Sequence, residues 1–175
     1  MLHQPRIRLA TPDDAAALAE LGARTFAHSF AHSCSAADLA AFLAATYTPA
    51  HQRAELADPA VRLFVAELPE RAALAGFAML REASAPPCIA GPRPIALARL
   101  YARNDLIGRG IGARLLEVCA RDAHGRGFRT LWLGVWEHNH RARAFYVRHG
   151  FRDVGSHAFR IGADAQTDRI MERAL

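Results

Sequence analysis

The feature that most constrains this chain is a run of three glycines, Gly108, Gly110 and Gly112, between two regular elements. Residues 95–102 before it are strand-like, and residues 113–125 after it have the apolar spacing of an amphipathic helix. The first N–H groups of a helix lack intrahelical acceptors and lie at the positive end of its dipole. Glycines there allow positive φ angles and let an anion approach the backbone. The pattern predicts a phosphate-binding turn, and a plain glycine-rich turn is the alternative.

The composition limits the chemistry available to such a turn. The chain has 175 residues and a net charge of +5, and it contains arginine but no lysine. A Walker A phosphate loop and Schiff-base catalysis both need lysine, so neither applies. About half of the residues are apolar (51%), which suits a single domain over residues 1–175. Acids are interspersed with the arginines, so we expect a solvated surface and no nucleic-acid partner.

The sequence carries no signal for a membrane or for secretion. No stretch approaches the roughly 18 apolar residues of a membrane span, and no apolar block follows the charged N-terminal residues. The cysteines, Cys34, Cys88 and Cys119, are odd in number and far apart, which argues against a disulfide framework or a zinc site. We therefore expect a cytoplasmic protein with no membrane partner.

Capping residues and turn signals divide the remaining chain into elements. The expected elements are helices opening at Thr11, Ser35 and Thr48; strands over 61–67 and 73–83 around a turn at 68–71; a proline-rich loop at 84–94; a strand over 129–139; a helix over 139–150; and strands over 151–161 and 167–175 around a turn at 162–166. This order predicts an α/β (α+β) domain with one mostly antiparallel central sheet and flanking helices.

A dinucleotide-binding oxidoreductase is one alternative reading of the glycines. Glu137 follows the next strand, where a ribose-binding acid would lie. However, that fingerprint is G-x-G-x-x-G, whereas the spacing here is G-x-G-x-G. Only one strand–helix–strand unit is present, and the strands around it pattern as hairpins. The oxidoreductase is therefore disfavoured.

Two blocks, RLYARNDLIGRGIGARLLE and NHRARAFYVRHGF, resemble in order and separation the signature motifs of the GNAT N-acyltransferase superfamily. The segments LWLGVWEHN and VGSHAFRIGADAQTDRIM extend the resemblance to the PaiA-like polyamine acetyltransferases within it. The resemblance covers nearly the whole chain. It implies a GNAT fold with a splayed pair of central strands, and acetyl-CoA as the acyl donor.

The same resemblance assigns the residues that hold the donor. Freed backbone groups of Leu100, Tyr101 and Ala102 would bind the pantetheine and the thioester. The diphosphate would lie on the turn and the first helical N–H groups. The residues of this turn are Ile107, Gly108, Arg109, Gly110, Ile111, Gly112 and Ala113. Asn139 matches a motif asparagine that contacts the cofactor, and it also suits a helix N-cap.

The chain departs from the family pattern in two places. Ile107 stands where the motif has Arg or Gln, so Arg109 or Arg114 would supply the positive charge. Ala96 and Ala98 stand where many relatives carry glutamates in the strand before the turn. The usual carboxylate that accepts the proton of the amine is therefore missing.

Tyr146 matches the family tyrosine that faces the sulfur, although core packing with Ala142 and Phe145 is the alternative role. A phenol pKa of about 10 exceeds a thiol pKa of about 8.5, so a tyrosine can protonate a departing thiolate. Only about one primary amine in a thousand is unprotonated at pH 7, so the reaction needs a proton acceptor. Glu137 is the best remaining carboxylate, and a water relayed past Tyr101 is the alternative.

Two pairs of histidines are closely spaced in the sequence and could contribute to a site. His138 and His140 have the spacing of metal ligands but lack further paired ligands, so no metal site is expected. His28 and His32 share one face of a predicted helix, either an ordinary helix face or part of the acceptor pocket that the resemblance implies.

The resulting hypothesis is an acetyl-CoA-dependent N-acetyltransferase acting by direct attack in a ternary complex, because no cysteine lies in a nucleophile motif. The acceptor is a small primary amine, a polyamine, or a protein or peptide amine. A polyamine would require acidic partners, and this chain is net basic. A non-catalytic acyl-CoA-binding regulatory domain is the alternative, and a homodimer stays open.

Overall fold

The computed structural model describes residues 5–68 and 71–175. One seven-stranded sheet has the order β1-β2-β3-β4-β5-β7-β6. The elements are β1 (Arg6–Leu9), η1 (Pro12–Asp14), α1 (Ala15–Phe30), α2 (Ala36–Thr46), α3 (Pro49–Ala57), β2 (Val61–Leu68), β3 (Arg71–Arg81), β4 (Pro94–Ala102), η2 (Asn104–Leu106), α4 (Ile111–Gly125), β5 (Thr130–Trp136), α5 (His140–Arg148), β6 (Arg152–Ile161) and β7 (Asp164–Ala174). Every neighbouring pair is antiparallel except β4 with β5. The predicted α/β class with a mostly antiparallel sheet is confirmed.

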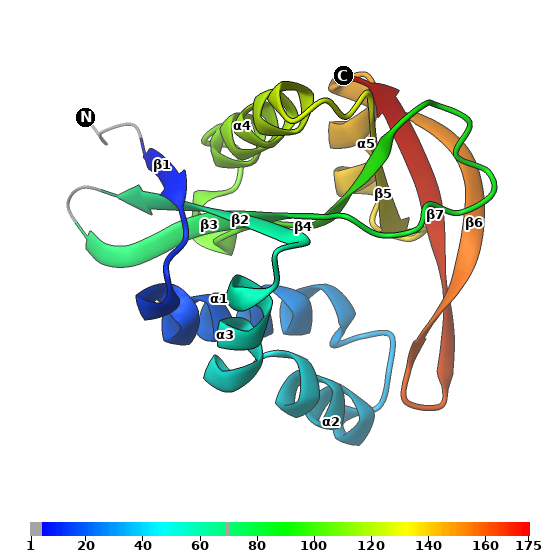
Figure 1. Ribbon diagram of the computed structural model, residues 1–175. Helices are drawn as coiled ribbons and strands as arrows, with labels where there is room; N and C mark the ends of the chain where they lie inside the picture. The colour runs from blue at the N-terminus through cyan, green and yellow to red at the C-terminus, as the bar shows by residue number, and fades with distance from the viewer. Residues whose placement is uncertain (1–4, 69–70) are drawn as a thin grey trace.

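Helices cover both faces of the sheet. Figure 1 shows α1, α2 and α3 gathered on one side and α4 on the other. On the α1 side, Leu18 packs with the buried Phe77 and Met79 of β3. On the α4 side, Leu115 and Leu116 pack in the largest apolar cluster, which includes residues of β3, β4, β5 and β7. The central strands are therefore buried from both faces.

The expected helix caps form in the structure. The Oγ of Ser35 accepts a hydrogen bond from the amide of Asp38 at 3.0 Å, and the Oγ1 of Thr48 accepts one from the amide of His51 at 3.1 Å. Thr11 opens η1, which leads directly into α1. Because short polar side chains satisfy the first free amides of each helix, the sequence alone marks these starts.

Several element boundaries differ from the predictions. Strand β1 was not predicted, because its four residues (RIRL) are too short for a pattern and its pairing with β2 is entirely non-local. Helix α4 begins at Ile111 instead of residue 113, since Gly110 is its N-cap. Strand β7 begins at Asp164, so the turn expected over 162–166 is shorter. Within the expected turn at 68–71, residues 69–70 lie outside the described residues.

The central strands separate halfway along their length. Strand β4 pairs with β5 only over residues 94–96, opposite 130–132. Strand β4 stays paired with β3 up to Ala102, and a register shift leaves Ala98 as an extra, bulged residue. Strand β5 stays paired with β7 up to Trp136. A gap therefore opens between β4 and β5, as the resemblance implied for a splayed pair.

An ion-pair cluster fixes the edge of the sheet to the start of α1. Both Nη atoms of Arg8 donate to the carboxylate of Asp14, at 2.7 and 2.8 Å, and its Nε donates to Glu67 at 2.8 Å. Asp14 also accepts from the amide of Thr11 at 2.7 Å. The hydrogen bonds from Arg8 hold the pKa of the Asp14 carboxyl below its ordinary value.

We predict that Asp14→Ala lowers the free energy of unfolding by about 2 kcal/mol, because it removes a bidentate pair and a cap from a mostly buried position. Because the folded-state pKa of Asp14 is depressed, its contribution is present above the ordinary aspartate pKa of about 4. It is lost as the pH falls through the lower folded value. Urea unfolding at neutral and acidic pH measures both effects. The exposed neighbour serves as control, and Asp13→Ala should change stability by less than about 0.5 kcal/mol.

Candidate functional site

The gap between β4 and β5 brings together the backbone predicted to hold the donor. Residues 97–102 of β4 have no strand partner on the side of β5. Leu100, Tyr101 and Ala102 lie in this segment, as expected. Strand backbone that is not paired offers N–H and C=O groups to a ligand. The unpaired stretch is therefore a place where an extended chain can bind as an additional strand would.

The glycine turn closes one end of this gap. Gly108 and Gly110 have φ angles of 85° and 77°, and a Cβ built at either would meet nothing within 4 Å. The positive φ, and not crowding, therefore requires glycine at both positions. Gly112 lies in the helix, and its Cβ would make ordinary contact with Phe145 at 3.7 Å. Small residues thus leave the backbone at the helix mouth uncovered.

The amide groups of this turn are available to an anion. Across residues 5–68 and 71–175, no acceptor is present for the N–H groups of Gly108, Gly110, Ile111, Gly112 and Ala113. The amide of Arg109 is the exception and donates to the carbonyl of Leu106 at 3.2 Å. The Nη1 atom of Arg114, in the first turn of α4, is buried without a partner. The side chain of Ile107 is 38% exposed and offers no charge. Free amides, a helix dipole and one unpaired guanidinium nitrogen suit a diphosphate.

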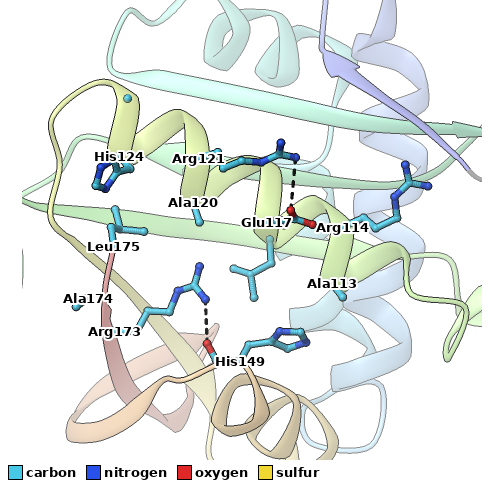
Figure 2. A pocket seen from close by; sticks show the side chains of 12 residues that line it. Ala113, Arg114, Glu117, Ala120, Arg121, His124, His149, Arg173, Ala174 and Leu175 are labelled. Carbon is cyan, nitrogen blue, oxygen red and sulfur yellow. Dashed lines mark hydrogen bonds and ion pairs between the residues drawn. The ribbon is translucent and has the colours of Figure 1, made fainter.

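A hollow of about 700 Å³ adjoins this turn on the outer side of α4. Figure 2 shows it between α4, the end of β7 and the residues after α5. Ala113 and Arg114 line one end of it, beside the glycine turn, and His124 lines the other. At its edge, Nη1 of Arg173 donates to the carbonyl of His149 at 2.9 Å. The hollow lies on the opposite side of the sheet from α1.

Tyr146 on α5 approaches the gap from the α4 side. Its ring is buried and packs edge-to-face on Phe145 and Phe151, with centroids 5.3 and 5.4 Å away. Its hydroxyl has no hydrogen-bond partner in the described part of the chain. Burial raises the pKa of Tyr146, and the charge of Tyr101 raises it further. Tyr146 therefore stays protonated at neutral pH and has a proton free to donate.

Asn139 caps the helix that carries Tyr146. Its Oδ1 accepts a hydrogen bond from the amide of Ala142 at 3.1 Å. Its predicted structural role is thus confirmed, and its cofactor contact stays a prediction. Gly150 ends the helix with a φ of 84°.

Tyr101 points to the other face of the sheet. Its hydroxyl lies 3.0 Å from the hydroxyl of Tyr47, and its ring packs edge-to-face on Phe77. Burial raises the pKa of Tyr101, the hydrogen bond with Tyr47 lowers it, and the charge of Asp168 also raises it. Tyr101 packs in the cluster on the α1 side, whereas Tyr146 packs in the cluster on the α4 side.

Glu137 follows the end of β5. Its side chain is 39% exposed and lies 3.7 Å from Nε2 of His138. Its charge also acts on Arg169, whose guanidinium is bound to Asp153. Glu137 forms no hydrogen bond or ion pair with Tyr101 or Tyr146 among the described residues. Its predicted role in amine binding stays a prediction.

Two carboxylates near the gap were missed by the sequence analysis. Glu55 on α3 is buried and bound by Arg99 at 2.6 Å and Arg81 at 3.1 Å. Asp168 on β7 pairs in register with Trp136, and its Oδ2 lies 3.9 Å from Nε2 of His157. Burial raises the pKa of Asp168. The alternation of side chains along a strand could have predicted which face of β7 carries Asp168. It could not have predicted that Asp168 lies near the gap, because that depends on the pairing of β7 with β5.

The histidines do not form a site. His28 and His32 are exposed, and the expectation that they share a helix face is wrong, because α1 ends at Phe30. His138 and His140 are exposed as well. Among the described residues, no group of three or more His, Cys, Asp or Glu side chains could hold a metal ion. No helix in the described ranges is long and apolar enough to span a membrane.

Comparison with known proteins agrees with this geometry. A model of the Acetyltransferase (GNAT) family matches residues 25–151. An uncharacterized N-acetyltransferase of Mycobacterium tuberculosis (strain ATCC 25618 / H37Rv) is 32% identical over 162 residues, which are 93% of this chain and 98% of that protein. An uncharacterized N-acetyltransferase of Lactobacillus delbrueckii subsp. lactis is 37% identical over 84 residues, 48% of this chain and about half of that relative (49%).

Solved structures share the whole fold. The PaiA N-acetyltransferase of Thermoplasma acidophilum, in complex with coenzyme A, superposes with a TM-score of 0.82 at 20% identity, covering 99% of this chain and 100% of that one. The ribosomal-protein-S18-alanine N-acetyltransferase of Escherichia coli gives a TM-score of 0.70 at 18% identity, covering 97% and 93%. At these identities the likeness shows the fold.

We predict that Gly110→Ala lowers the free energy of unfolding by about 1 kcal/mol, because alanine is strained at its φ of 77°. Gly112→Ala is the matched control, since Gly112 is helical and its Cβ would make ordinary contact. It should be neutral or stabilising by up to about 0.5 kcal/mol. Chemical denaturation of both variants measures the difference, and equal effects would contradict the role assigned to the left-handed turn.

Proposed function

Since this chain belongs to the GNAT family and is an acetyltransferase, we propose that it moves the acetyl group of acetyl-CoA to a primary amine. The observation that carries this proposal is the row of free amides at the mouth of α4, beside a gap that Tyr146 borders. We propose further that residues 1–175 act as a single N-acetyltransferase domain.

The glycine turn and the open strand edge would hold the donor. When bound, acetyl-CoA supplies an activated acetyl thioester. The amides of Gly108 and residues 110–113 fit its diphosphate, and the free nitrogen of Arg114 lies in the same turn of helix. Leu100, Tyr101 and Ala102 offer strand backbone to the pantetheine. Arg114 thereby replaces the charge that Ile107 cannot provide.

Tyr146 would act as the acid of the reaction. Its hydroxyl has no competing partner, and burial keeps it protonated. The same burial also raises the pKa of a thiol in the gap, so a departing thiolate would still attract this proton. Tyr146 donates to the sulfur while the C–S bond breaks.

Attack by the amine on the thioester would be direct. Cys119 is fully buried and burial raises the pKa of its thiol, so it supplies no nucleophile. Cys34 and Cys88 lie in the α1–α2 connection and in the β3–β4 loop, away from the glycine turn in sequence. Glu137 stays the candidate that the sequence offers for binding or deprotonating the amine.

We predict that Tyr146→Phe lowers kcat about 100-fold and leaves the Kd for acetyl-CoA within about threefold of wild type. Removing one hydroxyl keeps the ring packing on Phe145 and Phe151 and deletes only the proton donor. Thiol release with a panel of primary amines gives kcat, and calorimetry gives Kd.

Val147→Ala is the control for Tyr146→Phe, because Val147 is the next residue of α5 and is 60% exposed. It should leave both constants unchanged. Tight acetyl-CoA binding by wild type with no thiol release on any amine would instead support the non-catalytic regulatory domain and overturn the proposed function.

A further inference from the structure

Two side chains converge above Gly134, in the middle of β5 on the α1 side of the sheet. A Cβ built at Gly134 would lie 3.1 Å from Oδ2 of Asp168 and 3.3 Å from Cε1 of His157. Gly134 is nevertheless exposed, although its strand lies between β4 and β7. β5 has no partner on the side of β4 beyond Trp132. The Asp168 carboxylate therefore lies over the exposed backbone of Gly134, at the border of the gap.

Asp168 is a half-buried carboxylate that no arginine binds among the described residues. The buried carboxylates Asp14, Glu55 and Glu172 are each bound by at least one arginine. The side chain of Asp168 is only 18% exposed, yet across the described ranges neither oxygen accepts a hydrogen bond. Its one ion-pair contact is His157, at 3.9 Å. Because this carboxylate is largely shielded and no arginine binds it among the described residues, its surroundings suit a cationic ligand that supplies donors.

Asp168 lies on the face of the sheet opposite to that of the proposed acid. Strand alternation puts Asp168 on the α1 side, because Met171, three residues later in β7, packs in the cluster on the α4 side. Asp168 and Tyr101 belong to the α1 side, whereas Tyr146 packs in the cluster on the α4 side. The carboxylate and the proposed acid thus face the same gap from opposite faces of the sheet.

Glu55, the other carboxylate on the α1 side, does not compete for this role. Arg99 and Arg81 both bind it, and His51 lies 3.5 Å from its Oε1. The Arg99 guanidinium also stacks over the ring of Tyr47 at 5.3 Å. The negative charge of Glu55 is therefore already neutralised, and that of Asp168 is not.

We propose that Asp168 binds the ammonium group of the acceptor and takes its proton, with Gly134 as the floor of the site. The inference rests on the proposed function and identifies the acceptor as a primary alkylammonium that enters from the α1 side. Asp168 takes the role of the glutamates that many relatives carry in the strand before the glycine turn, where this chain has Ala96 and Ala98.

The proton balance of the reaction follows from these positions. The ammonium gives one proton to Asp168, and its lone pair then forms the C–N bond with the acetyl carbon. The nitrogen loses a second proton as the C–S bond breaks. One of the two protons restores Tyr146 after its hydroxyl protonates the sulfur, and the other leaves to solvent. His157, 46% exposed and beside Asp168, lies on the route to solvent.

The test compares Asp168→Asn with wild type in amine binding and in turnover. Calorimetry on the CoA-loaded protein uses butylamine, putrescine, spermidine and alaninamide as probes. We expect the variant to weaken binding of the preferred amine at least about tenfold and to lower kcat/KM about 100-fold. The Kd for acetyl-CoA should stay within about threefold. The melting temperature should not fall, because the change breaks no hydrogen bond to Asp168 among the described residues.

Two further variants sharpen this test. Gly134→Ala puts a methyl group against Asp168 and His157, whose side-chain ends can shift, so it should raise the amine KM about tenfold and preserve the fold. Asp164→Asn removes a carboxylate from the start of the same strand and should change neither constant. Glu137→Gln should have a smaller effect on the amine KM than Asp168→Asn.

The outcomes separate this inference from the proposed function. Equal amine binding by wild type and Asp168→Asn would overturn the inference, whether or not thiol is released. A larger loss in Glu137→Gln than in Asp168→Asn would overturn it as well. Amine binding that depends on Asp168, without thiol release by wild type, would support the inference and overturn the proposed function.

Discussion

The β4 strand cannot stay paired with both of its neighbours, and the candidate site depends on that conflict. Up to Ala96 it holds β3 on one side and β5 on the other. Beyond the bulge at Ala98 it follows β3, while β5 follows β7. The backbone N–H and C=O groups that β4 and β5 would otherwise use to pair with each other are therefore available to a ligand. Because helices cover both faces of the central strands, the opening between β4 and β5 lies within the packed part of the sheet.

The arginines bind carboxylates elsewhere in the fold and leave the polar groups at the gap between β4 and β5 unbound by arginine among the described residues. The chain carries no lysine, and arginines bind the buried carboxylates Asp14, Glu55 and Glu172. Planar guanidinium groups suit this task because they give two hydrogen bonds to one carboxylate. Within residues 5–68 and 71–175, no arginine binds Asp168, and neither the Tyr146 hydroxyl nor the amides of Gly108 and residues 110–113 have a hydrogen-bond partner. A net basic protein can therefore still present one negative group to a cationic amine.

Prediction from sequence succeeded where the cause was local. Ser35 and Thr48 cap helices because their side chains reach amides three residues on, and Gly108 and Gly110 adopt the positive φ expected of the glycine turn. Prediction failed for β1, whose four residues are held by pairing with β2 and by the bond from Arg8 to Glu67, 59 positions away. The predicted strand over 167–175 was also three residues too short at its start, because β7 pairs with β6 up to the tip of the hairpin at Asp164.

The sequence by itself determined the local elements of the candidate site: the turn at Gly108 and Gly110, the cap at Asn139 and the helix that carries Tyr146. Their spacing is short, and the physics of a helix N-terminus does not depend on the remaining chain. Only the tertiary structure decided which carboxylates are free. Nothing in the sequence near Glu55 or Asp168 reveals that arginines from β3 and β4 neutralise the first. The second lies over Gly134 of a neighbouring strand, because burial and pairing are properties of the assembled sheet.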